Sequence, residues 1–297
     1  TVVSPASRTR EAKSGSSATC TVSVRASTGA GSGGSPACWR AMPICSRRAW
    51  AAPGSSRGSS ASQVRALDAA LIAAGTPGFE LMQRAAHAIW RALRREWPQA
   101  GAVTVLAGHG NNAGDGYLVA ALARRAGWQV RVLAVSEPQR LQGYAALARD
   151  EACAVGVEIL NWQADSEPRG VLVDALLGTG LAGEVREPYS LAIDWINRSG
   201  QPVLAVDIPS GICADSGQVL GRAVTTQLTV TLIGLKIGLF VGQALDHVGR
   251  LVFDDLQADS KIVASQPFMA QRLAGAALPR VAPRQPTTHK GQLGHLL

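Results

Sequence analysis

The sequence predicts an α/β fold, a Rossmann-like three-layer αβα sandwich built around a mostly parallel sheet. Short apolar runs of strand length alternate with segments of about 10–15 residues that have helical spacing. The apolar runs are continuous, which is typical of parallel strands buried on both faces. With 297 residues and 46% hydrophobic content, the chain has enough material for one large core.

The ordered part is expected to begin with two helices. Ser62 is expected to cap the first helix, which continues to Ile72, and the second ends near Trp97-Pro98. Strands are then expected at 103–107, 130–135, 158–160, 171–177, 203–207, 223–233 and 251–253. Helices are expected between them at 116–126, 141–156 and 191–199. After about Ile262 the chain becomes rich in Pro and Arg, which predicts a linker.

The positive charge of the chain lies outside its predicted domain. The formal net charge is +8, but residues 1–60 hold eight basic residues and one acid. This segment is also rich in Ser and Gly without a periodic apolar pattern, so we expect a disordered basic tail or sequence that is not native. Residues 61–270 carry 17 basic and 20 acidic residues. The mildly acidic domain, expected at 61–262, argues against nucleic acid as a partner.

Several classes of protein are disfavoured by what the sequence lacks. No stretch of 18 apolar residues occurs, so a membrane span is not expected. Only Cys153 and Cys213 fall in the predicted domain, which favours a reduced, cytoplasmic compartment. A Walker A loop is absent, and the glycine-rich segment 108–116 after the first predicted strand does not have the GxGxxG spacing of a dinucleotide-binding fingerprint. The segment 208–211 lacks the first glycine of a GxSxG elbow. The five histidines are scattered, which disfavours zinc.

The first of three polar clusters, GHGNNAGDG at 108–116, follows the predicted strand 103–107. Its glycines let the backbone approach a ligand closely, and the helix that follows offers free N–H groups to phosphate. The alternative is a tight turn in which Asn and Asp serve only as turn and capping residues. Because ligands of such folds lie beyond the carboxyl ends of the strands, we favour the functional interpretation.

The other two clusters also follow strands. Asp174 opens DALLGTGLAG, and an ionised Asp inside an apolar strand needs a partner, either a cation or neighbouring loop amides. Asp207 and Ser210 belong to DIPSG, where Asp207 could exchange protons with a ligand or could only cap a turn. Oxygen ligands from Asn112, Asp174 and Ser210 would suit an alkali or alkaline-earth ion. Lys236 is either a lysine at the edge of the core or a charge that reaches the ligand.

Together GHGNNAGDG, VDALLGTGLAGE and AVDIPSGICADSG resemble the YjeF N-terminal-domain family, the NAD(P)H-hydrate epimerases. The resemblance covers roughly residues 62–260 and implies an isomerase that interconverts the R and S forms of hydrated NADH and NADPH. It further implies a potassium ion held by Asn112, Asp174 and Ser210, with Asp207 as the candidate acid/base at the altered nicotinamide ring. The residues expected to line the substrate's phosphates and ribose are Asn111, Asn112, Ala113, Gly114 and Asp115, together with Gly178, Thr179, Gly180, Leu181, Ala182, Gly183 and Glu184. The family normally has Gly at the position of Ala113.

The resemblance also bears on the flanks and on the assembly. Residues 288–297 resemble the opening of the NAD(P)H-hydrate dehydratase domain, so 263–297 is expected to be a linker and the truncated start of that domain. The family implies a homodimer. Two alternatives remain open. One is a Rossmann-like module that binds a nucleotide or a protein without catalysis. The other is a nicotinamide oxidoreductase, which is disfavoured because 108–116 lacks the GxGxxG spacing and no acid directly follows the predicted strand 130–135.

Overall fold

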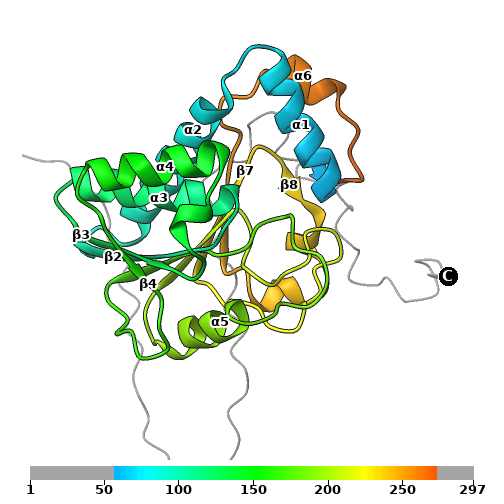
Figure 1. Ribbon diagram of the computed structural model, residues 1–297. Coiled ribbons are helices and arrows are strands. Elements are labelled where there is room, and N and C mark those ends of the chain that lie inside the picture. Colours follow the sequence, from blue (N-terminus) through cyan, green and yellow to red (C-terminus); the bar gives the residue numbers. More distant parts are fainter. Residues whose placement is uncertain (1–56, 273–297) are drawn as a thin grey trace, which may run out of the picture. The chain divides into compact units, whose positions relative to one another are not determined.

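The computed structural model describes residues 57–272, which are built around a seven-stranded sheet with helices on both faces (Figure 1). The sheet has the order β4-β3-β2-β5-β6-β7-β9, and every neighbouring pair of strands is parallel. This confirms the predicted α/β fold. The strands are β2 Ala102–Ala107, β3 Gln129–Ala134, β4 Glu158–Asn161, β5 Val171–Ala175, β6 Val203–Val206, β7 Leu228–Leu232 and β9 Arg250–Asp254.

Helices form the two outer layers. One face of the sheet is covered by α2, α3 and α4, and the other by α5 together with 3₁₀ turns (Figure 1). Among the described residues, none of the helices is long and apolar enough to cross a membrane. The helices are α1 Ala61–Ala73, α2 Gly78–Glu96, α3 Asn111–Arg125, α4 Gly143–Ala154, α5 Tyr189–Arg198 and α6 Ser260–Ser265, and the 3₁₀ turns are η1 Pro138–Arg140, η2 Ile237–Phe240 and η3 Gly242–Asp246.

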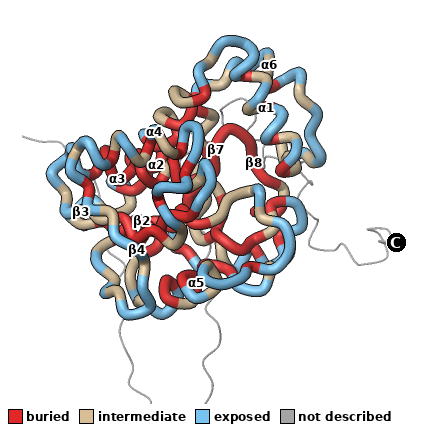
Figure 2. The backbone as a smooth tube through the Cα atoms, viewed as in Figure 1, coloured by how far each residue is buried: buried red, intermediate tan, exposed pale blue. Residues whose placement is uncertain are grey.

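The continuous apolar strands serve both layers at once. Successive side chains of a strand point to opposite faces of the sheet. Val105 and Val173 therefore pack beneath α2, α3 and α4, whereas their neighbours Leu106 and Leu172 pack with Ile193 of α5. The central strands are buried along nearly their whole length (Figure 2). Because both faces of these strands are buried, their sequences do not alternate between apolar and polar residues.

The order of the strands creates a crevice between β2 and β5. The chain runs from β2 outward to β3 and β4, then returns to the other side of β2 with β5. The connections that follow β2 and β5 therefore diverge at a topological switch point, where open α/β sheets bind ligands. Gly108 lies at this point, and a Cβ atom there would be 1.9 Å from the carbonyl oxygen of Leu176. Glycine is required for the two connections to approach so closely.

A small second sheet, β10-β1-β8, joins both flanks of the predicted domain 61–262. Its strands are β1 Arg57–Ser59, β8 Leu235–Lys236 and β10 Ala270–Gln271. The first residues of the predicted linker therefore form the end of α6 and β10, because Val263 packs against the main core and β10 pairs with β1. The rest of the predicted tail and linker, residues 1–56 and 273–297, lies outside the described residues.

Several predicted boundaries are wrong by a few residues. Helix α3 begins at Asn111 and not at 116, because Gly110 is extended and the next four residues are already helical. Ser60, not Ser62, caps α1, where it forms a capping box with Gln63. Strand β7 is shorter than the predicted 223–233, since Thr226 is bonded to the carbonyl of His247 outside the ladder. Strands β5 and β6 end one or two residues earlier than predicted.

Candidate functional site

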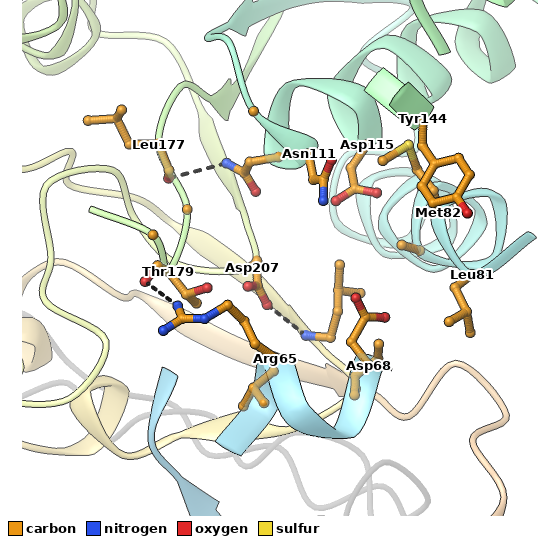
Figure 3. Close-up of a pocket in the computed structure, with 18 of the residues that line it drawn as sticks. Arg65, Asp68, Leu81, Met82, Asn111, Asp115, Tyr144, Leu177, Thr179 and Asp207 are labelled. Atoms are coloured by element: carbon orange, nitrogen blue, oxygen red, sulfur yellow. Dashed lines mark hydrogen bonds between the residues drawn. The ribbon is translucent and has the colours of Figure 1, made fainter. Parts of the chain in front are cut away.

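A cavity of about 610 Å³ lies beyond the carboxyl ends of β2, β5 and β6 (Figure 3). Residues from the connections after these strands form one side of it, and residues of α1 and α2 form the other. All three predicted polar clusters contribute to its wall. Its charged and titratable lining residues are Arg65, Asp68, His109, Asp115, Tyr144, Asp207 and Lys236.

The first turn of α3 faces this cavity. Asn111, Asn112 and Asp115 line it, whereas Ala113 and Gly114, which were also expected to contact the substrate, are buried and do not line it. A Cβ atom at Gly114 would be 2.7 Å from the sulfur of Met82. The first N–H groups of a helix have no acceptor within the helix and carry a partial positive charge. Anionic ligand groups can therefore bind at this helix end.

The connection after β5 forms the wall opposite α3. Thr179 accepts a hydrogen bond through its carbonyl oxygen from Arg65 of α1 at 3.4 Å (Figure 3). Gly183 and Glu184, which were predicted to contact the substrate, are exposed and do not line the cavity. The residues of the predicted set that do line it are Gly178, Thr179, Gly180, Leu181 and Ala182.

Beneath these loops Asp174 and Ser210 form a buried hydrogen-bonded pair. The Ser210 hydroxyl donates to Oδ1 of Asp174 at 2.6 Å, and the Ser210 backbone N–H donates to Oδ2 at 2.8 Å. The Leu176 N–H also donates to Oδ1, at 3.3 Å. The Asp174 carboxylate thus has the loop-amide partners that one interpretation of the sequence expected.

Asn112 joins the same group of residues. Its side-chain Nδ2 donates to the carbonyl oxygen of Leu177 at 3.2 Å, and the Leu177 N–H donates to the Ser210 hydroxyl at 2.9 Å. Burial raises the pKa of Asp174 to about 6, although the hydrogen bonds from Ser210 and Leu176 counteract part of this effect. The structure therefore brings Asn112, Asp174 and Ser210 together around Leu177.

Asp207 has an unusual backbone conformation at the end of β6. Its φ angle is +68°, a left-handed conformation that few residues other than Gly, Asn and Asp adopt. Its Oδ1 atom accepts a hydrogen bond from the Leu232 N–H at 3.1 Å and another from Lys236. All the bonds of Asp207 to described side chains and amides go to Oδ1. Oδ2 has no donor among residues 57–272 and can bind a ligand in the cavity.

Lys236 is the buried partner of Asp207. Its side chain is 1% exposed, and its Nζ atom donates to Asp207, to the carbonyl oxygen of Leu232 at 2.9 Å and to the hydroxyl of Thr231 at 3.2 Å. An ammonium group has three N–H donors, so all of them have acceptors within the protein. Lys236 is thus a buried lysine that also lines the cavity, and its contact with a ligand stays a prediction.

Two further carboxyl groups, those of Asp68 and Asp115, face the cavity (Figure 3). Burial raises the pKa of Asp115 well above 3.8, the negative charges of Asp207 and Asp68 raise it further, and Lys236 lowers it. Burial also raises the pKa of Asp68, against a smaller opposite effect of Lys236. The cavity therefore holds carboxyl groups with a stronger than usual tendency to keep a proton.

Sequence reasoning missed Asp68, Arg65 and Tyr144 as cavity residues. The helices that carry these residues were predicted, but the sequence did not indicate which side of each helix faces the cavity. One signal was available for Asp68, because it stands four residues after Val64 and four before Ile72, within the apolar stripe of α1. An acid on an apolar stripe needs a specific environment. Nothing comparable distinguishes Arg65 or Tyr144.

Comparison with known proteins identifies a family and relatives of this chain. The family described as "YjeF-related protein N-terminus" matches residues 78–238. The bifunctional NAD(P)H-hydrate repair enzyme Nnr of Coxiella burnetii is 41% identical over 238 residues, which cover 79% of this chain and 49% of that protein. The enzyme of the same name from Escherichia coli is 43% identical over 224 residues, covering 74% of this chain and 43% of that protein.

One further relative and one solved structure match this chain over most of their own length. The NAD(P)H-hydrate epimerase of Legionella pneumophila is 31% identical over 192 residues, which cover 62% of this chain and 71% of that protein. The crystal structure of the yeast protein ynu0 superposes with a TM-score of 0.59 at 20% identity, covering 72% of this chain and 96% of the yeast chain, and it supports the fold. The chain spans about half the length of the bifunctional relatives. By its family match and by its identity to these relatives, the chain belongs to the YjeF N-terminal family.

Proposed function

We propose that this chain is an epimerase that interconverts the R and S forms of hydrated NADH and NADPH in the repair of nicotinamide cofactors. The observation that carries the proposal is the convergence of the three family motifs on one cavity, with the free Oδ2 atom of Asp207 in its wall. Family membership and the printed names of the relatives support the substrate class.

The epimerisation needs a group that moves a proton close to the ring. The carbon that bears the added hydroxyl changes configuration when the hydroxyl leaves and returns, or when the ring opens and closes. Each route requires proton transfer and passes through a state in which a negative neighbour stabilises positive charge on the ring. Asp207 supplies such a carboxylate, and its ion pair with Lys236 keeps Oδ1 fixed while Oδ2 is free.

The remaining wall suits the rest of the substrate. The first turn of α3 and the glycine-rich connection 178–182 offer backbone N–H groups to the phosphates, as expected for a domain without an excess of positive charge. Arg65 adds one guanidinium at the same wall. Neutral donors therefore do most of the binding of an anionic ligand here.

Turnover of the purified R epimers of hydrated NADH and NADPH tests the proposed function directly. We expect conversion to the S form well above the uncatalysed rate, measured by chromatographic separation of the epimers. Binding of both hydrates without faster conversion would instead support the alternative, a nucleotide-binding module without catalysis. Reduction or oxidation of the nicotinamide ring would support an oxidoreductase.

We also propose a potassium ion at Asn112, Asp174 and Ser210. The donor set fits a hard cation, because it consists of an amide oxygen, a carboxylate and a hydroxyl next to the Leu177 carbonyl. A carboxylate can accept about four hydrogen bonds or ligand contacts, and three are used within the protein. A bound cation would supply the charge that offsets the buried carboxylate and would fix the connection after β5.

The potassium proposal predicts an effect on stability that depends on pH. The folded pKa of Asp174 is raised to about 6, so the ionised carboxylate costs stability, and this cost grows as pH rises from about 4 to above 6. Potassium should therefore raise the melting temperature at about pH 7.5 and much less at about pH 5. Thermal unfolding in KCl and in choline chloride of equal ionic strength measures the difference.

The matched variant for this measurement is Asp174→Asn, which keeps the size of the side chain but not its charge. We expect the difference between the two salts to disappear in this variant. Equal melting temperatures of the unmodified protein in both salts at about pH 7.5 would contradict the potassium site. A difference that persists in Asp174→Asn would place the ion elsewhere.

A further inference from the structure

The carboxyl group of Asp115 has no hydrogen-bond or ion-pair partner within residues 57–272, although it is half-buried. It projects from the first turns of α3 into the cavity and does not cap the helix (Figure 3). A buried polar group without a partner costs free energy. An unpartnered carboxyl in a cavity wall therefore points to a ligand group that completes its bonding.

The charges around Asp115 do not neutralise it. The three N–H groups of Lys236 donate hydrogen bonds to Asp207, Leu232 and Thr231. Arg65 of α1 donates one of its five N–H groups to the carbonyl of Thr179 and forms no ion pair with Asp115.

The other polar groups that face the cavity also do not neutralise the charge of Asp115. His109 shares a hydrogen bond of 2.6 Å with the hydroxyl of Tyr189, and Tyr144 of α4 has a neutral phenol. Asp68 of α1 adds a second carboxyl that also has no hydrogen-bond partner within the described range. Asp115 therefore meets two carboxyl groups, of which Asp207 is ion-paired and Asp68 is not.

We propose that Asp115 is the acid of the reaction, opposite Asp207 as the base. The inference rests on the proposed function. Two carboxyl groups in one site take different roles when their surroundings favour different protonation states. Here the surroundings differ in one clear respect, because Asp207 is paired with a buried ammonium group whereas Asp115 faces the negative charges of Asp68 and Asp207.

The roles of Asp115 as acid and Asp207 as base account for each bond that breaks or forms in the epimerisation. The Asp115 carboxyl gives its proton to the hydroxyl of the hydrated ring, the C–O bond breaks, and its electron pair leaves with water. The lone pair of the ring nitrogen forms a C=N bond, which creates the cationic ring. Water then adds to the other face of the same carbon, its oxygen forms the new C–O bond, and its extra proton goes to the carboxylate of Asp207. Solvent returns the proton from Asp207 to Asp115, so no oxidant or reductant is needed.

The pH dependence of turnover tests this assignment. Because the acid must be protonated, activity should fall as pH rises through the raised pKa of Asp115. Asp115→Asn should lower kcat by roughly 10²–10⁴-fold and remove this alkaline limb. Asp68→Asn removes a negative charge near Asp115, so it should move the limb to lower pH by roughly half a unit to one unit. A purely structural role of Asp68 would not move the limb in this direction.

A second readout does not depend on catalysis. Carbon-13 NMR of protein labelled at the aspartate carboxyl carbons should show one carboxyl that titrates well above the ordinary range and that is lost in Asp115→Asn. Its pKa should fall in Asp68→Asn and stay unchanged in Asp165→Asn, which removes one charge from an exposed turn between β4 and β5.

The outcomes separate this inference from the proposed function. An Asp115 carboxyl that titrates near 3.8, or an alkaline limb that survives in Asp115→Asn, overturns the assignment of the acid while epimerase activity stands. If the carboxyl titrates high but the unmodified protein does not convert the R epimer, the proposed function fails, and with it the role of Asp115 in the reaction.

Discussion

Asp207→Asn is expected to lower the epimerase kcat/KM by roughly 10²–10⁴-fold while the protein remains folded. Asn removes the ionisable oxygen but adopts the left-handed backbone conformation of +68° nearly as readily as Asp. The loss then reports the missing proton acceptor at the free Oδ2 position. It is measured with the R epimer as substrate, together with circular dichroism and a melting curve.

Asp207→Ala provides the comparison. It should lose activity to a similar extent but also lose stability, because alanine is less tolerant of a positive φ angle and leaves Lys236 without its charged partner. Near-normal turnover by Asp207→Asn would show that Asp207 does not move the proton. The melting curve of Asp207→Asn is recorded first, because turnover is informative only for a folded variant. A folded and fully active Asp207→Asn contradicts the role of Asp207 in proton transfer.

Lys236→Met is expected to reduce both stability and turnover. Removal of one member of a buried ion pair typically costs about 3–5 kcal/mol, because the remaining charge is left uncompensated. Here the Asp207 carboxylate would lose its buried partner, and the Leu232 carbonyl would lose a donor. The free energy of unfolding is measured by urea titration, and turnover is measured under conditions in which the variant is folded.

A double-mutant cycle separates the ion pair from simple packing. If the unpaired Asp207 charge causes the instability, Asp207→Asn combined with Lys236→Met should be more stable than Lys236→Met alone, although inactive. Additive losses of stability would show that the two side chains do not depend on each other. Full activity in the single variant Lys236→Met would contradict the role of Lys236 in positioning the Asp207 carboxylate.

The fold could be predicted from the sequence because strand burial leaves a direct mark. Strands such as Val171–Ala175 contribute to cores on both faces, so their sequence is continuously apolar and easily recognised. The first and last residues of the helices and strands were harder to predict from the sequence. The polar residues Asn111 and Asn112 are typical of a loop, yet they form the first turn of α3, which begins directly after the extended residue Gly110. The two-residue strands β8 and β10 are too short to leave a pattern.

The candidate site was predictable to the extent that it depends on short connections after strands. Asp207, Asn112 and Ser210 could be predicted because each belongs to a polar segment that follows a strand, and parallel strands bring such segments to one edge of the sheet. Asp68 and Arg65 come from α1, whose placement over the cavity depends on tertiary packing. The ion pair between Asp207 and Lys236 spans 29 positions, and no local pattern indicates it.

The small sheet links the segments that flank the predicted domain to the cavity residue Lys236. Strand β8 carries Lys236, and the residue beside it in the sheet is Ser59 of β1, which lies before the first residue of the family match at 78. On its other edge β1 pairs with β10, close to the end of the described residues. A shortened protein that starts at residue 61 would keep every recognisable motif but would remove the strand that braces the lysine. The backbone around Lys236, the ion-pair partner of Asp207, is thus paired with a strand outside the segment by which the family is recognised.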